Sequence, residues 1–418
     1  MIRRIKNLKD VVDWGLCVGC GACYYYCEEK VVALEDIEDV GIRPRFKEDQ
    51  CGSCYECLTF CPGITVNAHD QSLGGEGKLK VQDQELIGPY VSIWEGYAAD
   101  SIIREEASSG GLLSALSLYC LDNKAASFVV HTGAKNDRPW SNETVISRTR
   151  EDLVSRTGSR YAPSSPCDGL GLIDGKNGPA VFIGKPCDTT AVMELVKTRP
   201  ALNNNIGLIL TFFCAGVPST RAAVSLLEEH GYDPDRVAKL RFRGAGWPGR
   251  FEVTMKDGTI ARDLSYMESW SYLAKHRTYR CMICPDGLGE RADIACGDAW
   301  NRTGDIDGPG ISLAIARTSR GHDILLAAQK AGYVELKEVS SKEIILAQGL
   351  VHRRRECFGR MLAMKLLFIP TPRMKGFHLF RNWWSLPLLR RLRTVVGSLR
   401  RLVFRGYIFR GAYQSDPK

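Results

Sequence analysis

The sequence predicts a protein of mixed α+β and α/β class, with a small Cys-rich N-terminal domain, a larger α/β domain and a basic helical tail. Three observations support this fold class. Eight of the 16 cysteines lie within the first 61 residues. The long middle part alternates apolar, strand-like runs with helical patterns, which is typical of a partly parallel sheet covered by helices. The last part, residues 371–418, holds 11 Lys or Arg residues against a single Asp.

Length and composition fit this division. The chain has 418 residues, of which 44% are hydrophobic, enough for a sizeable core in several domains. A Gly-rich stretch at residues 71–80 is typical of a linker. The expected boundaries are a Cys-rich domain over 1–75, the two parts of the α/β domain over 88–170 and 171–345, and a basic tail over 350–418.

Short apolar runs in the middle part predict strands, and amphipathic stretches predict the helices between them. The clearest strands are "ASFVVHTG" (126–133), "PAVFIG" (179–184) and "IGLILTFF" (206–213). The clearest helices are "GGLLSALSLYCLDN" (110–123), "CDTTAVMELVK" (187–197) and "STRAAVSLLEEHG" (219–231).

The charge is concentrated in the tail. The whole chain carries a formal net charge of +8 and residues 371–418 carry +10, so the remainder carries −2. A near-neutral body argues against nucleic acid as a partner. The longest apolar run, 206–217, is shorter than the ~18–20 residues that span a bilayer. The first ten residues, "MIRRIKNLKD", lack the apolar core of a signal peptide, which predicts a cytoplasmic location and metal-bound thiolates rather than disulfides.

Two copies of the motif C-x2-C-x2-C-x3-C account for the cysteines of the first domain. Three thiolates in so tight a loop point at one [4Fe-4S] cluster, and the fourth cysteine points to the neighbouring cluster. One cluster is therefore expected on Cys17, Cys20, Cys23 and Cys61, and the other on Cys51, Cys54, Cys57 and Cys27. The alternative, a pair of zinc knuckles, needs C-x2-C pairs rather than eight matched ligands. The segment resembles a bacterial-type two-cluster ferredoxin, although Glu28 replaces the usual proline after the first motif.

Four further cysteines form a candidate site in the body. Cys281 and Cys284 are a C-x2-C pair, which is too short to hold a cluster alone. Cys187 and Cys214 each follow an apolar strand, and the ends of parallel strands converge at one edge of a sheet. Four thiols gathered there could hold a third cluster. The alternative is that they are packed side chains, as buried cysteines commonly are.

The body resembles the beta-subunit family of coenzyme F420 hydrogenases and dehydrogenases. The resemblance rests on stretches spread over about residues 88–345, among them "EASSGGLLSALSLYCLD", "TGSRYAPSSP", "GKPCDTTA", "FFCAGVPS", "RFRGAGWPG" and "CMICPDGLGERADIACGDAW". An N-terminal two-cluster ferredoxin fused to this domain occurs in relatives of that family, including enzymes similar to hydroxymethyl-chlorophyll reductase. The resemblance implies FAD and a [4Fe-4S] cluster in the body, the latter on Cys187, Cys214, Cys281 and Cys284.

Within this resemblance, two small-residue loops are candidates for FAD. Ser108, Ser109, Gly110 and Gly111 precede a predicted helix, where backbone N–H groups and the helix N-terminus favour a phosphate. The alternative is a plain cap and turn. Thr157, Gly158, Ser159, Arg160 and Tyr161 offer hydroxyl, amide and guanidinium donors, or form a solvated loop. Gly184 and Lys185 lie where the flavin and the body cluster would meet.

Other segments carry weaker signals. The stretch Arg243–Gly249 either lines the substrate face or forms a Gly-rich hairpin. Asp298, in the turn 297–300, is at least as well explained as a turn cap as by a catalytic role. No catalytic residue is assigned, and Cys120, Cys167, Cys296 and Cys357 stay structural or unassigned. No nucleophilic triad or zinc-hydrolase spacing is present.

These features predict an iron–sulfur flavoprotein oxidoreductase. Electrons would pass between a one-electron partner, such as a ferredoxin or a dehydrogenase or hydrogenase subunit, and a small organic two-electron substrate. Coenzyme F420 is the first candidate for that substrate. The alternative is a non-catalytic relay subunit of a larger redox complex.

The tail predicts a basic amphipathic helix within 383–409. Leu388, Leu392, Val395, Leu399 and Leu402 recur at helical spacing among six arginines, after a Trp pair. Such a helix suits peripheral attachment to an anionic membrane. The alternative is a helix docked on the protein's own core or on an acidic partner.

Overall fold

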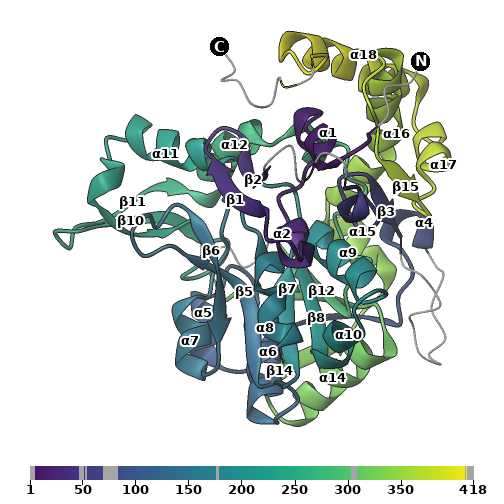
Figure 1. Ribbon diagram of the computed structural model, residues 1–418. Coiled ribbons are helices and arrows are strands. Elements are labelled where there is room, and N and C mark those ends of the chain that lie inside the picture. The colour runs from purple at the N-terminus through teal and green to yellow at the C-terminus, as the bar shows by residue number, and fades with distance from the viewer. Residues whose placement is uncertain are drawn as a thin grey trace.

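The computed structural model describes residues 5–46, 51, 54–68, 83–175, 178–302, 308–409 and 411. At its centre lies an eight-stranded sheet (Figure 1). The predicted linker at 71–80 lies outside the described residues. The strand order is β14 (Val334–Glu338), β4 (Ser92–Ala98), β13 (Ser312–Ala316), β12 (Ile294–Asp298), β8 (Ile206–Phe212), β7 (Ala180–Gly184), β5 (Phe128–Ala134) and β6 (Asn142–Ser147).

The sheet is mixed, which confirms the predicted partly parallel α/β architecture. Strands β12, β8, β7 and β5 run parallel, and the strands on both flanks are antiparallel. The three predicted strands correspond to β5, β7 and β8. The three predicted helices are also confirmed, as α6 (Leu112–Asp122), α9 (Pro186–Leu195) and α11 (Thr220–Glu229).

Helices cover both faces of this sheet, so its central strands are buried on both sides. On β5, Val129 belongs to one apolar cluster, whereas Phe128 and Val130 belong to another, as the two-residue period of a strand requires. The first cluster is closed by α5 (Ser101–Glu106), α6, α7 (Arg150–Ser155) and α14 (Ser319–Lys330). The second is closed by α8 (Leu170–Asp174), α9 and α10 (Pro200–Asn205).

A smaller antiparallel sheet extends the body. It packs with α11 and α12 around Phe242 and Leu273. The segment after it carries the C-x2-C pair on and just beyond a short helix. Its elements are β9 (Val237–Arg241), β10 (Arg250–Met255), β11 (Ile260–Ser265), α12 (Tyr266–Leu273) and α13 (Tyr279–Met282), with the 3-10 turns η4 (Pro234–Arg236) and η5 (Ala274–His276).

The Cys-rich segment lies directly on the body. The backbone N–H of Cys167 donates to the carbonyl of Cys20 at 3.1 Å, and Ser165 Oγ donates to the carbonyl of Gly19 at 2.7 Å. Both partners belong to or precede the turn η3 (Pro166–Gly169). The segment comprises α1 (Leu8–Asp13), α2 (Ala22–Tyr26), the hairpin β1 (Val32–Ile37) and β2 (Gly41–Phe46), the turn η1 (Glu56–Leu58) and β3 (Thr65–Asn67).

The tail returns to the Cys-rich segment. Strand β15 (Arg373–Lys375) pairs in parallel with β3, and the two ends of the chain share one apolar cluster with Val11, Cys17 and Leu402. Figure 1 shows the helices that follow residue 349 stacked at one side of the molecule. They are α16 (Leu350–Leu366), α17 (Leu379–Trp384) and α18 (Leu388–Phe404); α4 (Gln84–Ile87) and α15 (Ser341–Ala347) lie beside α16.

The predicted tail helix is confirmed as α18, but its predicted apolar stripe is divided between two faces. Val395, Leu399 and Leu402 pack into the shared cluster. Leu388 and Leu392 are exposed. No helix in the described part of the chain is long and apolar enough to cross a bilayer.

A glycine pair tests the packing of α18 on α16. A Cβ at Gly359 of α16 would overlap with Thr394 of α18 and lie 2.6 Å from Nε1 of Trp383, whereas a Cβ at Gly397 of α18 would meet nothing within 4 Å. Gly359→Ala should therefore lower the free energy of unfolding by about 1–3 kcal/mol. Gly397→Ala should raise it by about 0.5–1 kcal/mol, because alanine favours a helix. Urea denaturation of both variants measures these changes. If both substitutions raised the free energy of unfolding, or both lowered it, the close approach of α16 and α18 at Gly359 would be contradicted.

Candidate functional site

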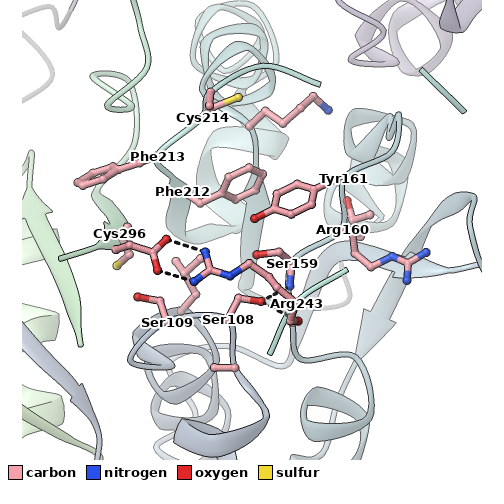
Figure 2. Close-up of a pocket in the computed structure, with 18 of the residues that line it drawn as sticks. Ser108, Ser109, Ser159, Arg160, Tyr161, Phe212, Phe213, Cys214, Arg243 and Cys296 are labelled. Atoms are coloured by element: carbon pink, nitrogen blue, oxygen red, sulfur yellow. Dashed lines mark hydrogen bonds and ion pairs between the residues drawn. The ribbon is translucent and has the colours of Figure 1, made fainter. Parts of the chain in front are cut away.

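A cavity of about 560 Å³ opens where the parallel strands end (Figure 2). Ile183 and Lys185 at the end of β7, Phe212 to Cys214 at the end of β8, and Asp298 at the end of β12 all line it. This size is within the range of cofactor and small-molecule sites, about 300–1,000 Å³. The carboxyl edge of parallel strands is also where open α/β sheets bind ligands.

The first candidate cofactor loop lies on the cavity wall. Ser108, Ser109 and Gly111 line it, and Gly111, the N-cap residue just before α6, has a φ of 77° that favours glycine. Ser108 Oγ accepts from the backbone N–H of Ser159 at 2.6 Å, which ties this loop to the second one. Gly110 is not among the lining residues; a Cβ there would lie 2.7 Å from the carbonyl oxygen of Gly96.

The second loop also reaches the cavity. Thr157, Ser159, Arg160 and Tyr161 line it, and Figure 2 shows the Tyr161 ring beside the cavity. The Arg160 guanidinium is occupied by the protein: it donates to Asn142 Oδ1 at 2.9 Å, among other acceptors. Burial lowers the pKa of Arg160 to about 10. The guanidinium therefore fixes the loop, and the cavity receives the backbone and hydroxyl groups.

Lys185 brings a buried positive charge to the wall. Its Nζ lies 2.8 Å from Asp188 Oδ2 and donates to the carbonyl of Ser164 at 2.7 Å. Burial opposes the charged form of the lysine, but the carboxylate of Asp188 outweighs burial and raises the pKa of Lys185. Gly184 is not a lining residue; a Cβ there would lie 2.8 Å from the Cβ of Asp188.

Two segments with weak sequence signals meet in the same cavity. Arg243 Nη2 lies 2.9 Å from Asp298 Oδ1, and Trp247 Nε1 donates to that oxygen at 2.9 Å. Dashed lines mark the Arg243–Asp298 pair in Figure 2. The guanidinium lies 4.3 Å from the ring centroid of Tyr266, which stacks on Trp300. Asp298 is thus an ion-pair partner rather than a simple turn cap, which the sequence could not indicate because the pair spans 55 residues.

Two other cations on the wall had no sequence signal. Arg277 and Arg353 both donate to the carbonyl of Ala215, and Arg353 also donates to the carbonyl of Cys214 at 2.8 Å. They hold the loop that carries Cys214 at the cavity. Only the three-dimensional proximity of positions 215, 277 and 353 reveals this role.

The structure brings the N-terminal thiols together in two crosswise groups. Burial raises the pKa of Cys61, and the neighbouring thiols of Cys20 and Cys17 raise it further. Burial likewise raises the pKa of Cys57 to about 12, with added effects from Cys51, Cys54 and Cys27. The fourth cysteine of each motif thus lies near the thiols of the other motif.

The four body thiols also form one group. Burial raises the pKa of Cys214 to about 12, and the thiols of Cys281 and Cys284 add to the rise. Burial is the main cause of the raised pKa of Cys187 too, with smaller effects from Cys214 and Cys284. Cys214 lines the cavity, so this group adjoins it. In the described part of the chain, no three His, Cys, Asp or Glu side chains converge as tightly as a single metal ion requires.

One of the unassigned cysteines lies between the N-terminal and body groups. Cys167 is fully buried; its backbone N–H bonds to Cys20, and its Sγ donates to the carbonyl of Asp188 at 3.7 Å, beside Cys187. Of the other unassigned cysteines, Cys296 lines the cavity, Cys120 is buried in the core, and Cys357 is buried on α16.

An α/β fold with a cavity of this size at the carboxyl edge of its parallel strands defines a class of proteins that bind a cofactor or another small molecule. Two family models identify it further, and both describe the beta chain of "Coenzyme F420 hydrogenase/dehydrogenase". The model of its N-terminal part matches residues 93–170, and the model of its C-terminal part matches residues 179–342. Together they match more than half of the chain, which therefore belongs to this family. The predicted family resemblance is confirmed; the ferredoxin-like segment lies outside the matched residues and stays a prediction.

Several proteins named for coenzyme F420 are similar to this chain. The F420-dependent formate dehydrogenase 1 subunit beta of Methanococcus maripaludis is 28% identical to this chain. The match covers 59% of this chain and 61% of the formate dehydrogenase subunit. The coenzyme F420-dependent sulfite reductase of Methanocaldococcus jannaschii is 24% identical over 84% of this chain, which spans only 52% of that protein. The coenzyme F420 hydrogenase subunit beta of Methanothermobacter thermautotrophicus is 24% identical to this chain. The match covers 69% of this chain and 99% of the hydrogenase subunit.

A solved structure shares the fold. It is a chain of the F420-reducing [NiFe] hydrogenase complex from Methanosarcina barkeri, with a TM-score of 0.50 and 23% identity. The match covers 64% of this chain and 93% of the hydrogenase chain. At this identity the likeness concerns the fold alone.

His131 gives the cavity a titratable group whose state is set by burial. The ring lines the cavity on β5, and its Nε2 lies 2.8 Å from Ser147 Oγ. Burial, with a smaller effect of Arg156, lowers its pKa from 6.5 to about 4. His131 is therefore neutral at neutral pH.

The depressed pKa predicts a stability change with pH. Between about pH 6.5 and 4 the unfolded chain binds a proton at this position that the folded chain does not, so His131 destabilises the fold progressively as the pH falls. Near pH 5 this should cost about 2 kcal/mol relative to pH 7. We expect the free energy of unfolding, from urea denaturation, to fall less steeply for His131→Gln than for the parent. Parallel pH profiles would contradict the assigned neutral state.

Proposed function

We propose that the chain is an iron–sulfur flavoprotein oxidoreductase. It passes electrons between a one-electron partner protein and an organic two-electron substrate. [4Fe-4S] clusters supply single-electron transfer, and FAD supplies the exchange between single electrons and hydride chemistry. Coenzyme F420 is the first candidate for the substrate, because the formate dehydrogenase, sulfite reductase and hydrogenase relatives carry it in their names.

One observation carries this proposal. A single cavity is lined by both candidate cofactor loops and by Cys214 of the body thiol group. Ser108, Ser159 and Lys185 would therefore hold a cofactor within one cavity of the proposed body cluster. This juxtaposition suits electron exchange between the two sites and has no evident use in a hydrolase.

The thiol groups fit anionic clusters because buried cations lie next to them. Arg43 and Arg280 are 4% and 2% exposed, and neither forms an ion pair with a carboxylate in the described part of the chain. Both counter the rise in pKa that burial gives Cys17, and Arg280 does the same for Cys284. A buried cation without a carboxylate is costly unless another negative group lies nearby. A thiolate-ligated cluster supplies that negative charge, so the donor set and its surroundings fit the group.

The charge of the cavity fits an anionic ligand. Six of its lining side chains are Lys or Arg and one is acidic: Arg156, Arg160, Lys185, Arg243, Arg277 and Arg353 against Asp298. Neutral His131 does not offset this balance. A cleft lined by one sign of charge concentrates ligands of the opposite sign. The phosphates of FAD, or an anionic substrate, match that field.

The placement of the thiol groups suggests where the protein partner docks. Cys54, of the second N-terminal group, is exposed, and the neighbouring Tyr55 is 69% exposed. Cys20, of the first group, lies near Cys167, whose Sγ donates to the carbonyl of Asp188, the residue after Cys187 of the body group. The sequence of sites from surface to cavity is thus outer thiols, inner thiols, body thiols and cofactor loops. We expect an external ferredoxin, or a dehydrogenase or hydrogenase subunit, to bind beside Cys54.

The second candidate function is a relay subunit that serves a partner's active site. Relatives named as beta subunits of a formate dehydrogenase and of a hydrogenase support this role. An elaborated cavity beside the body thiols favours the enzyme, because a relay does not need a substrate pocket. Reduction of the bound flavin by a small substrate in the absence of partners separates the two.

Iron content tests the clusters. We expect about twelve irons per chain after anaerobic reconstitution, four for each cluster. Cys281→Ala should remove about four and keep the rest, because it lacks one ligand of the body cluster. Cys120→Ala, at a thiol buried in the core away from the three groups, is the matched control and should keep all of them. Iron and sulfide analysis measures these contents. If the parent protein bound only about eight irons per chain, the body cluster would be removed from the proposal.

Flavin content and reduction test the cavity. Ser114 lies on α6 and lines the cavity, so Ser114→Trp should displace FAD while the iron content stays unchanged. Ser155→Trp, at an exposed position, is the matched control and should keep the flavin. Gly110 is unsuitable for this purpose, since any side chain there would disturb the sheet.

Both proteins are then mixed anaerobically with reduced coenzyme F420 and no partner protein, and flavin absorbance is followed. Bleaching of the flavin absorbance in Ser155→Trp, but not in Ser114→Trp, supports the enzyme function over the relay function. Full flavin retention by Ser114→Trp would place the flavin elsewhere. Bound flavin that reduced F420 leaves unbleached would exclude F420 as the substrate.

A further inference from the structure

Helices α17 and α18 present an apolar face to solvent. Along α18 the exposed residues recur at helical spacing and so form one stripe. Exposed aromatic rings on α17 continue this face. The residues of the exposed face are Phe380, Trp384, Leu389, Leu392, Val396 and Val403. Single exposed apolar residues need no explanation, but a contiguous face of this kind marks an interaction site.

The rest of the molecule fixes the direction of this face. On the opposite side of α18, Thr394, Ser398 and Leu402 are buried against the shared cluster. Trp383 Nε1 donates to Thr394 Oγ1 at 3.0 Å, which joins α17 to α18. The exposed face is therefore presented by packed helices, at the outer edge of the molecule in Figure 1.

Positive charge borders the exposed face. Arg393 and Arg400 are exposed on α18 and form no ion pair in the part of the chain that the structure describes. The Arg391 guanidinium lies 4.3 Å from the ring centroid of Trp384. The segment from residue 371 onwards carries +10, while the remainder of the chain carries −2. The occupant of this face is therefore negatively charged as well as apolar.

We propose that this exposed face binds flat on an anionic lipid bilayer. Apolar residues along one helix face, bordered by arginines and with Trp at one end, match the depth profile of a membrane interface, where apolar side chains enter the acyl boundary and guanidinium groups stay at the phosphates. A second copy of the chain would bring two strongly basic tails together, which electrostatic repulsion opposes. The lipid phosphates supply the charge that this face lacks.

Vesicle co-sedimentation of the full chain tests this inference. The probes are vesicles of phosphatidylcholine alone and of phosphatidylcholine with one quarter phosphatidylserine. We expect binding only to the anionic vesicles, reversed by high salt. Leu389→Glu should lower the partition coefficient at least about tenfold, because it removes a leucine that enters the bilayer on binding and adds a charge that the anionic lipid repels. Leu346→Glu makes the same change at a 70% exposed leucine on α15 and should bind like the parent.

A second pair of substitutions tests the charge without touching the apolar residues. Arg393→Gln with Arg400→Gln should lower binding about 30-fold at low salt, since each basic residue near an anionic surface contributes about 1 kcal/mol. Equal binding to neutral and anionic vesicles, or equal loss in Leu389→Glu and Leu346→Glu, would overturn the proposal. So would a parent that is dimeric without vesicles and becomes monomeric on Leu389→Glu. Iron and flavin contents should be the same in all these variants, so this test is independent of the redox proposal.

Discussion

Positive charge buried without a carboxylate is the constraint on which the arrangement of this molecule depends. Arg43 and Arg280 are almost fully buried, yet neither has an acidic partner in the described ranges. Both lie close enough to buried thiols to act on them: Arg43 and Arg280 oppose the rise in pKa that burial gives Cys17, and Arg280 does the same for Cys284. Desolvation of an unpaired cation costs several kcal/mol, so such residues persist only where another group supplies the opposite charge. The thiols and the arginines therefore belong together, and the fold has to hold them in one place.

Hydrogen bonds from Arg280 and from Arg353 join segments that are far apart in the chain. Arg280, next to Cys281, donates to the carbonyl of Pro62, next to Cys61, at 2.6 Å. Arg353 of α16 donates to the loop of Cys214. The Lys185–Asp188 pair connects the cavity wall to the turn that contacts Cys20 through Cys167. Separating the Cys-rich segment from the body would break the bonds from Arg280 to Pro62 and from Cys167 to Cys20 and leave buried polar groups without partners, so these contacts hold the two parts together.

The sequence predicted the parts of this arrangement that depend on local pattern. Apolar runs predicted β5, β7 and β8, and helical periodicity predicted α6, α9 and α11, because both depend on the spacing of neighbouring residues. Motif spacing and the convergence of strand ends also led to the proposed thiol groups, whose role as cluster ligands stays a prediction. The Arg243–Asp298 pair and the arginines at Ala215 were not predictable, since they join distant positions whose contact depends on the sheet order. Gly110 and Gly184 look like cofactor glycines in sequence, but in the fold they make room for Gly96 and Asp188.

The division of the apolar stripe of α18 between a buried and an exposed face was also not predictable, because it depends on contacts with a distant helix. Periodicity shows that leucines and valines lie on one side of a helix, but it does not show which of them meet another helix. Packing on α16 takes Val395, Leu399 and Leu402, which leaves Leu392 and Val396 in solvent.

The formal net charge of +8 thus combines two physically different sets of cations. The arginines near the thiols are desolvated, so dissolved salt screens them little and their effect on neighbouring groups is strong. The tail arginines are exposed, and charges in water are screened beyond about 8 Å at physiological ionic strength. The first set can therefore act on the protonation of the buried thiols whatever the ionic conditions. The second set can act only at short range on a surface of high charge density, which is the property that distinguishes a lipid bilayer from scattered acidic side chains.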